Sequence, residues 1–223
     1  MRAVRHHQGM ANPVKFDDER PPSLAEAIGG PVGMAETTIP GVAFVVAYTI
    51  SGSEIDVAAG VAVALALALT VIRLVRRESP LHALSGLVGV AFAAFVALAS
   101  GRAENFFLPG LLLNAVNTTA FVVSIAIRRP LVGVIVSQFD GESGDWRSDP
   151  VRMQAFVRAS WLWAGLFALR LLVQLPLYLA GAVVTLGVAR TAMGLPLFAL
   201  GLWLTWLLVR GSRATGPATP AAT

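Results

Sequence analysis

Four polar side chains lie inside long apolar runs of this sequence, where a charge or an amide is costly. They are Asn114, Asn117, Arg170 and Gln174. Inside a bilayer such a group needs a hydrogen-bond partner, an opposite charge or a ligand. At about 1.5 Å per residue, Arg170 lies roughly 15 Å into its run, and Gln174 follows one turn later on the same face. Asn117 is expected at the depth of Arg170, so the four residues form a candidate polar cluster.

Two interpretations of this polar cluster stay open. In the functional one, the cluster lies in a bundle core, where Arg170 attracts an anion or pairs with a carboxylate. In the structural one, Arg170 donates to backbone carbonyls and Asn side chains, while Asn114 and Asn117 make hydrogen bonds between helices. The sequence favours the structural interpretation, because no second unpaired charge is expected at the depth of Arg170.

The basic residues that separate the apolar runs predict how the chain crosses the bilayer. Four precede the first run, three follow the second, five lie between the fourth and fifth, and two follow the last, which makes 14 of the 17. The other gaps hold only Arg102 and Arg190. Because cytoplasmic loops accumulate Lys and Arg, this alternation predicts a multi-pass plasma-membrane protein of about six spans with both termini in the cytoplasm.

The apolar runs predict an all-α fold, a polytopic transmembrane helix bundle, because helices satisfy their own backbone in lipid. We expect a bundle over 23–210 with spans at about 35–51, 57–75, 81–100, 106–127, 159–179 and 190–209. Outside the spans we expect disordered cytoplasmic tails at 1–22 and 211–223, an interfacial helix at 23–30 and a cytoplasmic loop at 128–158. Whether 180–189 re-enters the membrane or belongs to a span stays open.

Small residues recur every fourth position on two of the expected spans. They are Gly60, Ala64 and Ala68 on one, and Ser85, Gly89, Ala93 and Ala97 on the next. Such stripes let helix backbones approach closely, so we expect a packing role for both.

Charged and polar residues also stand where spans begin. Glu36 comes at the cytoplasmic start of the first span, Arg102, Glu104 and Asn105 at the outer start of the fourth, and Arg190 at the outer start of the last.

Two of these starts resemble each other, since Glu36 and Glu104 each precede a Pro-Gly pair, Pro40-Gly41 and Pro109-Gly110. Each pair predicts a helix start or a break. Because the two spans enter from opposite sides, a 3+3 division would be an inverted repeat, as in many secondary transporters. A parallel similarity, in which Arg102 precedes Pro109 much as Arg190 precedes Pro196, is an equal alternative.

Composition excludes several classes of protein. Hydrophobic residues make up 56% and charged residues 13%, whereas soluble domains carry about 25% charged residues. The basic residues are spread over short loops, so we expect no nucleic-acid partner. With no cysteine, three histidines and no recognisable catalytic or phosphate-binding motif, we expect no metal, no cofactor and no enzyme activity.

Several motifs resemble an actinobacterial family of integral membrane proteins of unknown function. They are 101–110 (GRAENFFLPG) with Asn114, Glu36 through Pro40 to Phe44, Arg73-Leu74, 128–133 (RRPLVG), Arg170-Leu171, and 187–190 (GVAR) through Pro196. The similarity covers about 24–210 and implies a membrane fold but no activity. A fainter resemblance, limited to a Pro before a Phe-bearing first span and a Phe-x-x-x-Pro run, is to the inner-membrane septation protein A family, which is associated with envelope synthesis and division.

Two functions are therefore expected as alternatives. The first is a transporter or channel for a small, anionic solute whose path is lined by the polar cluster. The second is a non-catalytic envelope or division factor that acts through a membrane-protein partner or a second copy of the chain. In both, the bilayer is the principal partner.

Overall fold

A computed structural model of the chain describes residues 30–77, 80–140 and 146–214. Every regular element in these residues is a helix, which confirms the predicted all-α fold. The elements are α2 (Gly30–Ile50), α3 (Ile55–Val75), α4 (Pro80–Ser100), the 3-10 helix η1 (Ala103–Phe107), α5 (Leu108–Ala126), α6 (Leu131–Asp140), α7 (Pro150–Leu179), α8 (Val183–Ala192) and α9 (Leu195–Ala214). The predicted tail at 1–22 and the interfacial helix predicted at 23–30 lie outside the described residues, apart from Gly30, which begins α2. The side chain of Glu36 lies outside them as well.

Five helical segments are long and apolar enough to cross a membrane, so the chain is a multi-pass membrane protein. They are Ile55–Val75, Ala83–Ser100, Ala103–Ala126, Pro150–Leu179 and Val183–Arg210. The segment Thr38–Ile50, which belongs to the 21-residue helix α2, is a shorter apolar helix beside them.

The last apolar segment includes most of 180–189. Residues 183–192 form α8, which continues after a break at Met193 and Gly194 into α9, so both helices belong to one segment of 28 residues. The preceding turn forms where Gly181 takes a φ of +66°, a conformation that glycine adopts without strain.

The helix α7 begins earlier than the expected span start at Ala159. Its N-cap is Asp149, whose carboxylate accepts hydrogen bonds from the backbone N–H groups of Val151 and Arg152. Pro150 follows in the first turn, where its missing N–H costs nothing. This capping signal precedes the apolar run, so hydropathy alone does not show it. Residues 150–158 of the predicted cytoplasmic loop are therefore helical.

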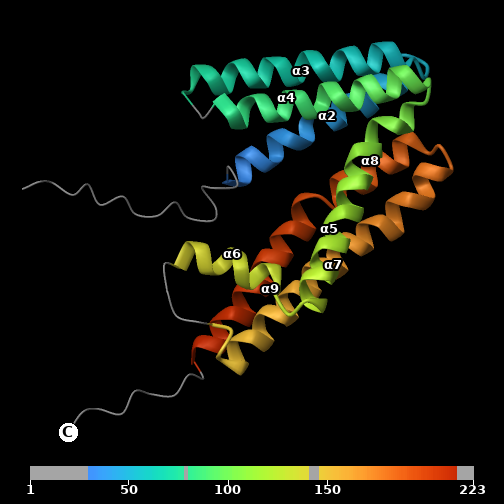
Figure 1. The fold of residues 1–223 in the computed structure, drawn as a ribbon. Helices are drawn as coiled ribbons and strands as arrows, with labels where there is room; N and C mark the ends of the chain where they lie inside the picture. Colours follow the sequence, from blue (N-terminus) through green and yellow to red (C-terminus); the bar gives the residue numbers. More distant parts are fainter. Residues whose placement is uncertain (1–29, 78–79, 141–145, 215–223) are drawn as a thin grey trace, which may run out of the picture.

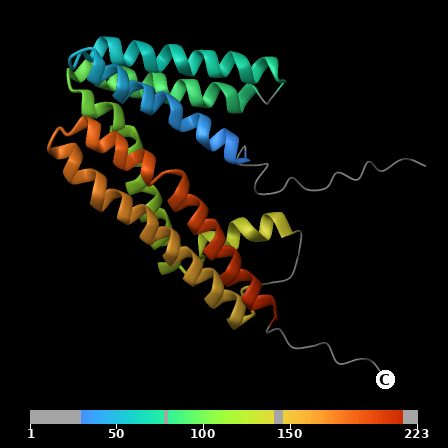
Figure 2. The same ribbon diagram turned by 180° about the vertical axis from the view of Figure 1, so that it is seen from behind.

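The helices form two arms that diverge from a common end (Figure 1). The N-terminal arm holds α2, α3 and α4, and the C-terminal arm holds α5, α7, α8 and α9. The α2–α3, α4–η1 and α7–α8 connections meet at the end that we call the closed end. The start of α2, the end of α3, the start of α4 and the end of α9 lie toward the opposite, open end, as the reverse view also shows (Figure 2).

The closed end is held by an apolar core that both arms share. Phe44 of α2 stacks on Phe106 of η1 with ring centroids 4.0 Å apart, and Phe107 meets both rings edge-on. Leu186 of α8 is fully buried in the same cluster. A second core, centred on Trp163 and Phe156, lies wholly within residues of the C-terminal half. Of these two described cores, the first joins the two arms, and it does so at the closed end.

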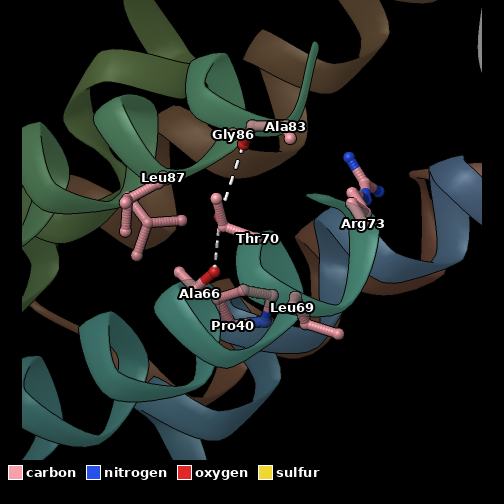
Figure 3. Close-up of a pocket in the computed structure, with 9 residues that line it drawn as sticks. Pro40, Ala66, Leu69, Thr70, Arg73, Ala83, Gly86 and Leu87 are labelled. Carbon is pink, nitrogen blue, oxygen red and sulfur yellow. Dashed lines mark hydrogen bonds between the residues drawn. The ribbon is translucent and has the colours of Figure 1, made fainter. Parts of the chain in front are cut away.

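The N-terminal arm packs through a different face of α3 than the small-residue stripe predicts. Gly60, Ala64 and Ala68 are exposed, whereas Ala62 and Thr70 are buried. The Thr70 hydroxyl, which can donate one hydrogen, lies 2.8 Å from the Ala66 carbonyl oxygen and 3.3 Å from that of Ala83 on α4 (Figure 3). This face of α3 is the buried one because its alanines and Thr70 pack against α4. The small cavity beside Thr70 holds about 60 Å³, room for only a few water molecules.

Gly187 is the point of closest approach between α8 and α2. A Cβ atom at this position would collide with the Val45 side chain and lie 3.5 Å from the Phe107 ring. Val45 is buried and β-branched, so its side chain has little freedom to turn aside. We expect Gly187→Ala to lower the free energy of unfolding by about 1–3 kcal/mol, the usual cost of overpacking. The midpoint of thermal unfolding in detergent measures this.

The matched control for this joint is Gly165→Ala, because nothing lies within 4 Å of a Cβ built on Gly165 in α7. Alanine favours a helix over glycine by up to about 1 kcal/mol, so this variant should be neutral or stabilised. Equal melting temperatures for the two variants would contradict a tight joint at Gly187.

Candidate anion-binding cavity

A cavity of about 780 Å³ lies between the two arms. Residues of α2 and α4 line it from the N-terminal arm, and residues of η1, α5, α7, α8 and the α8–α9 break line it from the other side. This volume is within the range of small-molecule sites, roughly 300–1,000 Å³. The cavity is far larger than the one beside Thr70, and it is the candidate site.

All four members of the predicted polar cluster line this cavity. Asn114 and Asn117 come from α5, and Arg170 and Gln174 come from α7. Gln174 is only 2% exposed, whereas the other three are half-buried. Two helices that are far apart in sequence therefore bring the predicted residues to one space.

Arg170 is held by the break between α8 and α9. Its Nη2 donates to the carbonyl oxygen of Gly194 at 2.8 Å, and its Cζ lies 5.9 Å from the centroid of the Phe167 ring. The same carbonyl accepts from the Phe198 N–H at the start of α9, so both lone pairs of the oxygen are used. The buried Nε of Arg170 has no hydrogen-bond partner among the described residues.

Arg190, predicted at the outer start of the last span, is a second cation in the cavity. It lies in the last turn of α8, inside the apolar segment Val183–Arg210. Its guanidinium lies directly against Gly110 of α5, and its Cζ is 5.7 Å from the centroid of the Phe107 ring. Because the expected last span began at Arg190, the sequence placed this residue at a span entry and apart from the polar cluster. The signal in the sequence is that Arg190 is the only charged residue of this 28-residue segment before Arg210 at its end.

Gly110 makes this position of Arg190 possible. A Cβ atom at Gly110 would occupy the space of the Arg190 guanidinium. The Pro109-Gly110 pair therefore has two roles: Pro109 starts α5, as predicted, and Gly110 leaves room for the charge. The similar pair Pro40-Gly41 behaves differently, because Pro40 lies inside the continuous helix α2.

The charge of the cavity is positive. Among the residues whose side chains the structure describes, no carboxylate lies within ion-pair distance of Arg170 or Arg190. Two guanidinium groups that line one cavity repel each other, and an anion between them would reduce that repulsion. Arg groups bind carboxylate and phosphate oxygens in a bidentate manner, which sets the class of anion that the cavity suits.

The wall opposite the arginines is built from the small residues of α4. Ser85, Gly89 and Ala93 line the cavity, and nothing lies within 4 Å of a Cβ built on Gly89. For Ser85 and Gly89 the expected packing role is therefore wrong, because the arms diverge and no helix fills the space in front of them. Ala93 and Ala97, nearer the closed end, are buried in the shared core as expected.

The predicted polar residues at the start of the fourth span meet at the closed end. Arg102 Nε lies 2.7 Å from Glu104 Oε1, in an ion pair whose Arg is exposed and whose Glu is buried. Asn105 donates through Nδ2 to Ser100 Oγ at 2.8 Å, and its Oδ1 accepts from the Tyr178 hydroxyl at 2.6 Å. These hydrogen bonds link α4 of one arm to α7 of the other, so they fasten the closed end.

A sequence model of one protein family, described as "Protein of unknown function (DUF3159)", matches residues 28–215. The match confirms the resemblance to a membrane-protein family of unknown function, and the fainter resemblance to septation protein A stays a prediction. No curated protein and no solved structure matches the chain.

The Tyr178–Asn105 hydrogen bond offers a test of the closed end. We expect Tyr178→Phe to reduce the free energy of unfolding by about 1–3 kcal/mol, because the buried Asn105 Oδ1 loses its donor. The control is Tyr48→Phe, since the Tyr48 hydroxyl makes no hydrogen bond to any described residue. Thermal unfolding of both variants measures the difference. An equal shift in both would mean that this bond does not fasten the arms.

Proposed function

The chain belongs to the DUF3159 family of proteins of unknown function, and we propose that it is a transport protein that admits a small anionic solute to the cavity between its arms. The observation that carries the proposal is the pair Arg170 and Arg190 in one cavity, with no acidic partner among the described side chains. Asn114, Asn117 and Gln174 supply further hydrogen-bonding groups beside this pair.

The structural interpretation accounts for only part of this arrangement. Arg170 does bond to a backbone carbonyl, but through one nitrogen of a group that carries five donors. Arg190 contacts the Phe107 ring and has no hydrogen bond to a described residue. A charged side chain without a partner is costly inside an apolar segment. A bound anion would supply that partner for Arg190.

The arrangement of the helices supports transport. The arms meet at the closed end and diverge around the cavity, and the helix beside the arginines is broken at Gly194. Broken helices at a central site between two groups of spans are typical of secondary transporters. If the molecule lies in the plasma membrane with both termini in the cytoplasm, as the basic loops predict, the open end faces the cytoplasm. The 3+3 inverted repeat, which would relate the arms, stays a prediction.

The absence of cysteine permits a direct test of the cavity. A thiol at Gly89→Cys faces the cavity, whereas a thiol at Gly60→Cys faces away from it; nothing lies within 4 Å of a Cβ at either position. In proteoliposomes we expect the anionic methanethiosulfonate ethylsulfonate to modify Gly89→Cys about tenfold faster than the cationic ethyltrimethylammonium reagent, because two arginines concentrate anions. Gly60→Cys should react slowly with both reagents.

A control tests whether the arginines cause the faster reaction of the Gly89→Cys thiol with the anionic reagent. Replacing Arg170 or Arg190 by Gln should reduce it, while Arg210→Gln should not, since Arg210 lies over Trp206 outside the cavity. Reagents added to one side only will show where the cavity opens. A cavity thiol that reacts with neither reagent from either side would refute the proposal.

Transport itself is tested by the uptake of radiolabelled inorganic phosphate and succinate into proteoliposomes. We expect Arg170→Gln and Arg190→Gln to lower uptake of the transported anion by about 10- to 100-fold, the loss of one charge-assisted hydrogen bond. Arg210→Gln should retain uptake, and unchanged melting temperatures would show that the variants fold. Arg-independent uptake, or no uptake of either probe, would argue against transport.

A further inference from the structure

The wall of the cavity is apolar as well as cationic. Phe92 of α4 and Leu112, Leu113 and Val116 of α5 line the same space as the arginines. These four side chains are 56–62% exposed, which is high for residues of a cavity. A fully hydrophilic ion bound to the arginines would leave this apolar area uncovered.

The two kinds of surface are separated along α5. Arg190 lies against Gly110 in the first turn of the helix. Leu113 and Val116 follow one and two turns later, roughly 5 and 9 Å further along the axis. A ligand whose anionic group meets the arginines can therefore extend an apolar portion along α5, opposite Phe92.

We propose that the anion bound by this cavity is amphipathic, with a phosphate or carboxylate headgroup between Arg170 and Arg190 and an alkyl chain against Leu113, Val116 and Phe92. The inference rests on the proposed function and names its substrate class. A membrane lipid and a free alkyl phosphate share this chemistry. Either one buries the apolar wall that a small hydrophilic anion leaves exposed.

The test measures how alkyl phosphates protect the Gly89→Cys thiol from the anionic thiol reagent. The probes are inorganic, butyl and octyl phosphate, added to the purified full-length protein in phosphatidylcholine nanodiscs. Each fully buried methylene should lower the half-protecting concentration by about fourfold. We expect octyl phosphate to protect at a concentration at least tenfold lower than inorganic phosphate. Octyl glucoside, which has the same chain and no charge, should not protect.

Two variants separate the apolar wall from the headgroup site. Leu113→Asn should weaken protection by octyl phosphate by about tenfold and leave protection by inorganic phosphate unchanged. The matched control is Leu172→Asn, because Leu172 is exposed on α7 and does not line the cavity. Arg190→Gln should weaken protection by all three phosphates.

The outcomes distinguish this inference from the proposed function. Protection that depends on Arg190 but not on chain length would overturn the amphipathic ligand and leave a site for a hydrophilic anion. Protection that survives Arg190→Gln would overturn the arginine site itself. Nanodiscs that contain phosphatidylglycerol identify the source: protection without added phosphate shows a membrane lipid, and protection only by added octyl phosphate shows a free amphiphile. Both of these last results support the inference.

Discussion

The hydrogen bond from Arg170 to the carbonyl oxygen of Gly194 ties the cavity to the backbone of the C-terminal arm. The Gly194 carbonyl lies at the break before α9, and it accepts this bond through its second lone pair, beside the one from the Phe198 N–H. Gly194 provides the break, and its missing side chain lets the chain pass close to the carbonyl oxygens of Arg190 and Thr191, each 3.2 Å from a built Cβ. The same break ends α8 where Arg190 faces the cavity, so one local feature positions both cations.

Two cations in an apolar bundle constrain the larger architecture. They need space that anions or water can reach, and the divergence of the arms provides it. The arms can diverge because the closed end is strongly joined, by the Phe44–Phe106 stack and by the Ser100–Asn105–Tyr178 hydrogen bonds. The second core lies wholly in the C-terminal half and keeps α7 and α9 together without filling the space between the arms. The cavity is thus a consequence of where the apolar contacts are placed.

Glycine has different roles at the two ends of this arrangement. At the joint, Gly187 brings α8 against Val45. In the cavity, Gly110 leaves room for a guanidinium, and Gly89 leaves an open wall opposite it. The first contact brings the arms together and the other two leave space in the cavity, although all three glycines lie in similar apolar helices. Their neighbours in space, and not their local sequence, set these roles.

Hydropathy and the few polar residues in the apolar runs determined the helical membrane fold, most of the spans and the four residues of the polar cluster. These follow from the sequence because burying a charge or an amide in lipid is costly whatever the packing. Only the tertiary structure decided that Arg190 shares the cavity with Arg170, that α8 belongs to the last segment, and that the stripe at Ser85 and Gly89 faces open space. Each of these depends on which helices meet across the molecule. A repeat of small residues is equally compatible with a tight helix contact and with a cavity wall. The long-range contacts at the closed end determine which of the two forms.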